Sequence, residues 1–287
     1  MPIHFLKFIK SQQADKFIRL PASVKANGPI EGVYLFDGDR VQSRQLLFND
    51  GFPAVVFMPA KDSTSKVDVN GMAFSVGAVW ACGGIVKKTY WEVEAMKGEV
   101  FIVRFHPFSF FTLFDVNADC FQRQPVMDFS EILGSAYPAF VESFYQCINA
   151  REKVKFIERF IAAGKAVPTC PALLLEGMHY IDRNRGALSV KALNNAFKIM
   201  VNYKWWERNF KRYVGLSPQH YILLQRFLHA YMELEATPHK KLLEVALNNG
   251  YCDENHLLKD FRQYCGKPPG SYFRETGATG RVLYVAE

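Results

Sequence analysis

The sequence predicts an α+β protein, with a β-rich N-terminal part followed by helices and then an all-α C-terminal part. Between about residues 30 and 105, short runs of β-branched and aromatic residues alternate with turn-forming residues. After Pro107, apolar residues recur every three or four positions, which is the period of an α-helix. The distribution of charge further separates the C-terminal part from the rest.

Size and composition indicate a two-domain globular protein. The chain has 287 residues, enough for two domains of ordinary size. A hydrophobic content of 49% and an aromatic content of 15% argue against intrinsic disorder. No stretch approaches the roughly 18 uninterrupted apolar residues of a membrane span, and the N-terminus lacks the apolar core of a secretory signal. We therefore expect a cytoplasmic protein with no membrane partner.

The β-rich part is expected to form an antiparallel sheet or a small barrel. Five runs are predicted as strands: 33–36, 44–48, 54–60, 72–80 and 99–105. Turn formers that suit hairpins stand between them at 38–40, 49–51, 70–71 and 97–98. Helices are predicted over 108–114, 128–134 and 139–162, with Asp128 or Ser130 as a cap for the second.

The expected domain boundary lies in a linker rich in proline and glycine at 164–172. It separates a β-rich domain, residues 1–165, from a helical domain, residues 172–275. The final stretch GATGRVLYVAE is predicted as a terminal strand or a loose tail.

Positive charge is concentrated in the C-terminal third. Residues 180–274 contain 15 Lys and Arg against 8 Asp and Glu, whereas the remainder contains 20 of each. A basic part joined to a neutral one is expected when one part attracts a polyanion, although a merely basic solvated surface has the same composition. The six cysteines include no C-x-x-C pair and the seven histidines no H-x-x-x-H spacing, so we expect neither a metal nor a cofactor.

The basic part repeats one pattern, a short helix followed by a turn and a second helix. In the first motif, Ser189 is placed to cap the short helix and Asn202 to cap the second helix, YKWWERNFKRYV. Every fourth residue of this second helix is apolar and should face inward: Trp206, Phe210 and Val214. The opposite face presents four cations: Lys204, Arg208, Lys211 and Arg212. Gly215 ends the helix, and Ser217-Pro218 begins a long one that runs to about Glu235.

The second motif begins near Lys241 with a short helix that Gly250 ends. Asp253 is placed to cap the helix that follows. Its inward residues again repeat every four positions: Leu257, Phe261 and Cys265. The opposite face carries Glu254, Asn255, Leu258, Lys259 and Arg262.

In this layout the second helix of each motif can enter the major groove of DNA. The groove is about 12 Å wide and admits one helix, whose first turns meet base edges while later cations reach phosphates. Arg208 offers a planar fork to guanine, Asn255 an amide to adenine and Glu254 a carboxylate to cytosine. Two motifs joined by one helix could read consecutive grooves with a single chain.

Residues 177–274 resemble the double helix-turn-helix domain of AraC/XylS-type bacterial transcription regulators. The second motif has the family's signature spacing: V-A-x-x-x-G-Y at Val245 to Tyr251, then Asp253, His256, Leu257, Phe261, Arg262, Gly266, Pro269 and Tyr272. The first motif matches at Asn202, Trp206, Arg208, Phe210, Lys211, Gly215 to Pro218 and Tyr221. The resemblance implies double-stranded DNA as the partner, sequence-specific transcription regulation, RNA polymerase as a further partner of an activator, and no enzymatic activity.

The first motif departs from the family pattern. Its turn lacks the usual glycine, and AFKIMVN is about two residues longer. Two large side chains, Trp205 and Trp206, also stand in its recognition helix, with Trp206 at the position of the usual leucine. In the second motif, Lys259 stands where arginine is usual, which weakens the expectation of bidentate guanine reading. The residues expected to contact DNA are Lys204, Glu207, Arg208, Lys211, Arg212, Glu254, Asn255, His256, Lys259 and Arg262.

The first 170 residues more faintly resemble a cupin-like sensor domain that precedes this DNA-binding domain in some family members, mainly over 103–129. This resemblance implies binding of a small-molecule effector or pairing of two chains. An apolar effector pocket is predicted from Trp80, Tyr90, Phe105 and His106, with Trp91 and Phe108 beside them. Such residues more often simply fill the core of a barrel.

Two other functions stay open. An enzyme fused to a DNA-binding domain, as in methyl-accepting repair proteins, would need four clustered cysteines for zinc and an activated thiolate, and the spacings lack them. A protein with a degenerate DNA-binding domain would act through a protein partner instead, which the unusual first motif allows.

Overall fold

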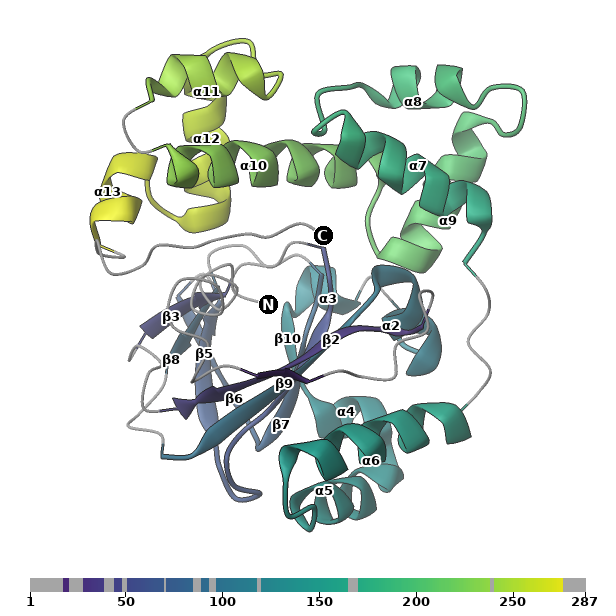
Figure 1. Cartoon of the computed structure of the whole chain (residues 1–287), viewed down its shortest axis with the longest axis vertical. Helices are drawn as coiled ribbons and strands as arrows, with labels where there is room; N and C mark the ends of the chain where they lie inside the picture. The colour runs from purple at the N-terminus through teal and green to yellow at the C-terminus, as the bar shows by residue number, and fades with distance from the viewer. Residues whose placement is uncertain are drawn as a thin grey trace. The chain divides into compact units, whose positions relative to one another are not determined.

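The computed structural model describes ten segments of the chain: 18–20, 28–38, 44–47, 51–69, 71–84, 89–92, 97–117, 120–164, 170–237 and 240–275. The chain divides into two compact units, an N-terminal one that ends at residue 168 and a C-terminal one that begins at residue 169 (Figure 1). The prediction for GATGRVLYVAE lies outside the described residues, as does most of the predicted linker.

The N-terminal unit contains two antiparallel sheets. The larger has the strand order β1 (Ile18–Leu20), β2 (Ile30–Asp37), β9 (Glu99–Phe105), β4 (Ala54–Phe57), β7 (Val79–Cys82) and β10 (Val126–Asp128). The smaller has the order β3 (Arg44–Leu47), β8 (Thr89–Glu92), β5 (Ser65–Val69) and β6 (Met72–Val76). The prediction of a β-rich N-terminal part is confirmed. Neither sheet is closed by the described strands, so the small-barrel, cupin-like detail is not seen.

The run 72–80, predicted as one strand, forms two strands in different sheets. Gly77 lies between β6 and β7, and its N–H donates to Oδ2 of Asp128 at 2.6 Å. A Cβ at this position would lie 2.9 Å from the same oxygen, so a side chain here would have to displace the carboxylate of Asp128. The chain therefore leaves one sheet at Gly77 and enters the other, which alternation of apolar residues alone could not reveal.

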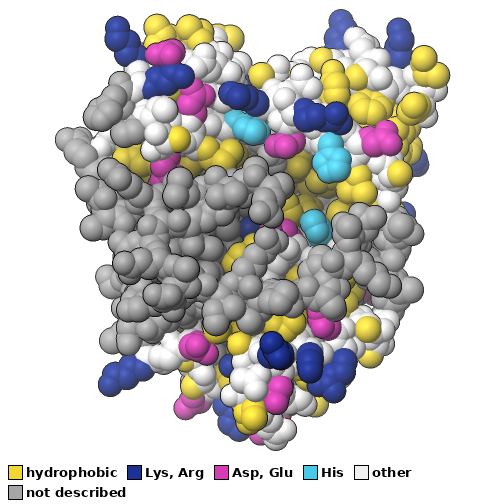
Figure 2. All heavy atoms as spheres, viewed as in Figure 1, with side chains coloured by type: hydrophobic (Ala, Val, Ile, Leu, Met, Phe, Trp, Pro, Cys, Tyr) yellow, Lys and Arg dark blue, Asp and Glu magenta, His cyan; other side chains and the backbone are white. Residues whose placement is uncertain are grey.

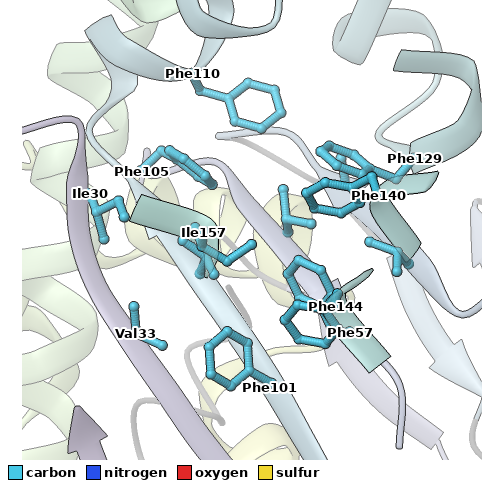
Figure 3. Packing of buried hydrophobic residues seen from close by; sticks show 14 of the residues in the cluster. Ile30, Val33, Phe57, Phe101, Phe105, Phe110, Phe129, Phe140, Phe144 and Ile157 are labelled. Atoms are coloured by element: carbon cyan, nitrogen blue, oxygen red, sulfur yellow. The ribbon is translucent and has the colours of Figure 1, made fainter. Parts of the chain in front are cut away.

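Helices cover one face of the larger sheet through a phenylalanine-rich core (Figure 3). They are α2 (Pro107–Leu113), α3 (Cys120–Arg123), α4 (Phe129–Leu133), α5 (Tyr137–Tyr145) and α6 (Ala150–Ala163), with a 3-10 turn, η2 (Gly134–Ala136), before α5. The ring of Phe57 stacks on Phe144 with centroids 4.0 Å apart, and Phe105 meets Phe110 edge to face at 5.4 Å. Asp128 caps α4 in a capping box with Glu131, which confirms one of the two predicted caps.

The described part of the C-terminal unit is helical, as predicted. Its helices are α7 (Ala172–Arg183), α8 (Val190–Ala196), α9 (Tyr203–Val214), α10 (Pro218–Ala236), α11 (Leu242–Asn248), α12 (Glu254–Cys265) and α13 (Pro269–Glu275). Helix α10 extends from the group α7–α9 to the group α11–α13 (Figure 1). No helix among the described residues combines the length and apolarity needed to cross a membrane.

Helix α10 shares a core with both groups. At its start, Tyr221 packs against Phe210 of α9, with ring centroids 5.4 Å apart. Further along, Phe227 and Tyr231 pack against Phe261 of α12 at 5.3 and 5.8 Å. The long helix is therefore part of the folded core and not a free linker.

Candidate nucleic-acid interface

The second helix of each motif begins at a capped residue. Oδ1 of Asn202 accepts the N–H of Trp205 at 3.0 Å at the start of α9. Oδ1 of Asp253 accepts the N–H of His256 at 2.9 Å at the start of α12. Each bond satisfies a backbone donor that the first turn of a helix leaves unpaired. The two predicted caps thus fix where each candidate recognition helix starts.

Both helices end in the same way. Gly215 after α9 has φ 78° and Gly266 after α12 has φ 75°, both in the left-handed region. Glycine adopts this conformation without the steric cost that a Cβ would impose. The equivalence of caps and ends shows that α9 and α12 are matching elements of two copies of one motif.

The inward faces are fully buried in both helices. Trp206 and Phe210 of α9 are completely inaccessible to solvent, as are Leu257 and Phe261 of α12. The large indole of Trp206 fits because α7 presents Gly177, where a Cβ would lie 2.5 Å from the Trp206 ring. Gly177 therefore compensates for the tryptophan that replaces the usual leucine.

The opposite faces carry the residues predicted to contact DNA. Nine of the ten are exposed: Lys204, Arg208, Lys211, Arg212, Glu254, Asn255, His256, Lys259 and Arg262. Glu207 is half-buried. The structure places four cations on α9, and an acid, an amide and a histidine in the first turn of α12 with two cations behind them. Figure 2 shows basic side chains among hydrophobic ones over the C-terminal helices.

Some of these side chains already have partners within the chain. Oη of Tyr203 donates to Oε1 of Glu207 at 2.8 Å, and this bond raises the pKa of Tyr203 above its ordinary value. Nδ1 of His256 lies 3.8 Å from Oδ2 of Asp253. Glu207 and His256 are therefore less available to a base than Arg208 and Asn255, which make no comparable contact with another described residue.

Two exposed apolar residues beside α9 were not among the site residues predicted from the sequence. In the turn between α8 and α9, the side chain of Ile199 is 94% exposed and that of Met200 is 68% exposed. They follow Lys198 and precede the exposed Tyr203. The signal was present in AFKIMVN, whose extra residues place apolar side chains outside the helical period.

The four residues of the predicted effector pocket do not share one surface. In the larger sheet, Trp80 pairs with Val56 and therefore faces away from the helix-covered side, to which Phe105 points. Trp80 instead meets Trp91 of β8, with ring centroids 5.3 Å apart. Tyr90, the neighbour of Trp91 in β8, points to the other face of the smaller sheet.

His106, the fourth pocket residue, follows β9 and stacks on Phe108 with ring centroids 5.3 Å apart. Burial lowers the pKa of His106, Glu31 opposes this shift and Arg104 adds to it. Among the described residues, no group of three or more His, Cys, Asp or Glu side chains is placed to hold a metal ion.

Comparisons with known proteins agree with this geometry. Residues 190–275 match the family model of a helix-turn-helix domain. Over 70 residues the chain is 39% identical to the HTH-type transcriptional regulator MtrA of Neisseria gonorrhoeae, a match that covers 24% of this chain and 23% of MtrA. The chain thus spans about a quarter of the length of this relative.

Two solved structures are similar to this chain at low sequence identity. Fatty-acid-bound ToxT from Vibrio cholerae is 11% identical, with a TM-score of 0.45 over 96% of this chain and 99% of ToxT. The AraC-like transcriptional activator CuxR is 13% identical, with a TM-score of 0.25 over 80% of this chain and 91% of CuxR.

Two helix-turn-helix motifs on one long helix define the class of the C-terminal unit as a double helix-turn-helix, DNA-binding domain. The match over residues 190–275 and the similarity to MtrA agree with the AraC/XylS-type resemblance of the signature residues.

Proposed function

We propose that this protein is a sequence-specific, DNA-binding transcription regulator that reads adjacent major grooves of one duplex with α9 and α12. The observation that carries the proposal is the pairing of equivalent helices, each capped at its start, buried on one face and polar on the other.

The two outward faces suit different parts of DNA. Arg208 has the planar fork that pairs with O6 and N7 of guanine, and Asn255 the amide that pairs with N6 and N7 of adenine. Glu254, in the first turn of α12, can accept from N4 of cytosine. Lys204, Lys211, Arg212, Lys259 and Arg262 supply the positive charge that releases counterions from phosphates.

The dimensions of the domain suit adjacent grooves. Helix α10 has 19 residues, which at about 1.5 Å per residue is roughly 28 Å. Consecutive major grooves on one face of DNA recur about every 34–36 Å. A helix of this length that carries one motif at each end is therefore of the right size to place α9 and α12 in two successive grooves.

The N-terminal unit is proposed to regulate the C-terminal domain, by pairing two chains or by binding a small molecule. The two sheets offer an aromatic interior at Trp80 and Trp91, and the helix-covered face of the larger sheet offers a second at Phe105. If the protein is an activator, RNA polymerase is its further partner. The proposed division of labour is regulation by residues 1–165 and DNA binding by residues 172–275.

Selection from a random pool of duplexes tests the proposal. The full-length protein should enrich one two-part sequence at about 0.15 M salt. The variant Asn255→Ala should lose discrimination at one or two base pairs, by about 1–3 kcal/mol each, while Lys211→Ala should weaken all duplexes alike and lower the salt slope by about one. Lys155→Ala, which removes an exposed cation of the N-terminal unit, is the matched control. Equal affinity for selected and random duplexes would show that the protein is not a sequence-specific regulator.

A further inference from the structure

The second motif touches the turn that precedes the first motif, in addition to being joined to the first motif by α10. Ala187 lies in the turn after α7, and Gly250 lies in the turn of the second motif. A Cβ added to Gly250 would be 2.5 Å from the Cβ of Ala187 and 3.0 Å from its Cα. Real Cβ atoms essentially never come within 3.0 Å of another atom, so a side chain at Gly250 would force the two exposed turns to shift apart.

The turn that carries Ala187 belongs to the first motif structurally. Helix α7, which precedes it, packs through Gly177 against Trp206 of α9. Tyr180 of α7 meets Phe197 at the end of α8, with ring centroids 5.7 Å apart. The position of Ala187 is therefore fixed relative to the first recognition helix.

Both turns also hold glycines in a conformation that favours glycine. Gly186 has φ 64° and Gly250 has φ 74°. A Cβ on Gly186 would lie 2.5 Å from the carbonyl oxygen of Ile222 and would collide with the backbone nitrogen of Arg226, both in α10. The first turn is thus seated on the backbone of α10 and, one residue later, against the second motif.

Arg226 completes this junction with its side chain. Its Cζ lies 4.2 Å from the ring centroid of Tyr251, the residue after Gly250. Oη of Tyr251 donates to Oδ2 of Asp260 in α12 at 2.9 Å, and Nη2 of Arg226 lies 3.7 Å from the same oxygen. One residue of α10 therefore contacts the first turn through its backbone and the second motif through its guanidinium group.

A second cluster fastens the far end of α10 to the second motif. The carboxylate of Glu233 accepts from Nζ of Lys240 at 2.6 Å and from Nδ2 of the fully buried Asn249 at 2.7 Å. At the first motif, Nε2 of His229 lies 3.1 Å from Oδ1 of Asp182 in α7. Polar contacts on both sides thus accompany the aromatic packing of α10.

We propose that the contact of Ala187 with Gly250, supported by Arg226, fixes the angle between α9 and α12 and makes the domain select one spacing between two half-sites. These are positioning residues, because they act on DNA through the recognition helices. The inference rests on the proposed function. One added base pair turns the second half-site by about 34° and moves it by about 3.4 Å, which a rigid domain cannot follow.

The experiment compares two duplexes, the selected site and the same site with one base pair inserted between its halves. The full-length wild-type protein should bind the inserted duplex at least about tenfold more weakly, since it loses most contacts of one motif. Gly250→Ala should push the motifs apart, and its affinities for the two duplexes should differ by less than about threefold. The double variant Ala187→Gly/Gly250→Ala keeps alanine at position 250, where the backbone is left-handed, but removes the Cβ of residue 187 that faces it. It should therefore recover most of the wild-type ratio between the affinities for the two duplexes.

Ala187→Val provides a second approach that does not place a side chain at a left-handed position. Like Gly250→Ala, it should bring the affinities for the selected duplex and the inserted duplex closer together. It therefore tests the inference even if Gly250→Ala does not fold. Wild-type spacing ratios in both variants, with a native circular dichroism spectrum in at least one, would overturn the inference and leave the proposed function standing. A wild-type protein that enriches no two-part site would contradict the proposed function itself and the inference with it.

Discussion

The two helix-turn-helix motifs share one plan but differ in their turns and in what their second helices present. The turn of the first motif is exposed at Ile199 and Met200, whereas the second turn holds the fully buried Asn249 and the nearly buried Tyr251. Helix α9 presents mainly cations and α12 begins with Glu254 and Asn255. The difference indicates that a repeated scaffold can be anchored at one copy and left exposed at the other without loss of the common helix geometry.

The chemistry of the two helices suggests unequal shares in recognition. Four cations on α9 favour contacts with phosphates, which add affinity but carry no sequence information directly. The acid and amide at the start of α12 are groups that distinguish one base from another. We therefore expect the second motif to contribute more to specificity and the first more to affinity, with Arg208 as the base reader of α9.

The largest expected effect concerns the enlarged core of the first motif. Trp206→Leu should leave a cavity against Gly177, and Gly177→Ala should overpack the intact indole, each reducing the free energy of unfolding by about 1–4 kcal/mol. In the double variant, the loss of unfolding free energy should be at least about 1 kcal/mol smaller than the sum of the two single losses, because leucine makes room for the methyl group of alanine. Urea unfolding followed by circular dichroism measures these values.

The second motif provides the control for that cycle. Leu257→Ala also removes a fully buried side chain, but in α12, whereas a Cβ at Gly177 would face Trp206 of α9. Leu257→Ala should lower the free energy of unfolding by about 2–5 kcal/mol. In combination with Gly177→Ala, the two losses should be additive. Strict additivity between Trp206→Leu and Gly177→Ala would mean that the two residues do not compensate for each other.

A smaller effect is expected at the helix caps, where the two motifs should behave alike. Asn202→Ala and Asp253→Ala each remove one side-chain acceptor from the first turn of a recognition helix and should cost about 1 kcal/mol of unfolding free energy. Asn202→Ser and Asp253→Ser retain a capping oxygen and should restore most of this loss. A cost confined to one motif would show that the two helices are not held equivalently.

The smallest effect concerns the pair that ties α7 to α10. The hydrogen bond from His229 lowers the pKa of Asp182, so the stabilisation is present above the ordinary carboxyl pKa and is lost as the pH falls through the lowered value. Because Asp182 is largely exposed, Asp182→Asn should cost less than about 1 kcal/mol at pH 6. The difference from wild type should shrink at pH 3, as measured by urea midpoints. A difference that grows at pH 3 would contradict this assignment.

Local features of the C-terminal part could be predicted from the sequence because they depend on nearby residues. The caps Asn202 and Asp253 and the buried four-residue repeats of α9 and α12 are found where the sequence indicated. Such features follow from helix period and side-chain chemistry within one or two turns.

Features that depend on distant partners were missed. The division of residues 72–80 between two sheets depends on Asp128, and the fit of Trp206 depends on Gly177. The predicted effector pocket combined Trp80 and Phe105, whose opposite directions follow only from strand register. The contact of Ala187 with Gly250 likewise joins two turns far apart in the chain.

The most direct measurement of the central claim is methylation protection of guanine N7, which lines the major groove, on the selected duplex, with wild type and two variants. Wild type should protect two major-groove regions centred about 10–10.5 base pairs apart. Arg208→Ala should lose protection in one region and Asn255→Ala in the other. Protection of a single region by wild type, or loss of the same region in both variants, would contradict reading of one duplex by both α9 and α12.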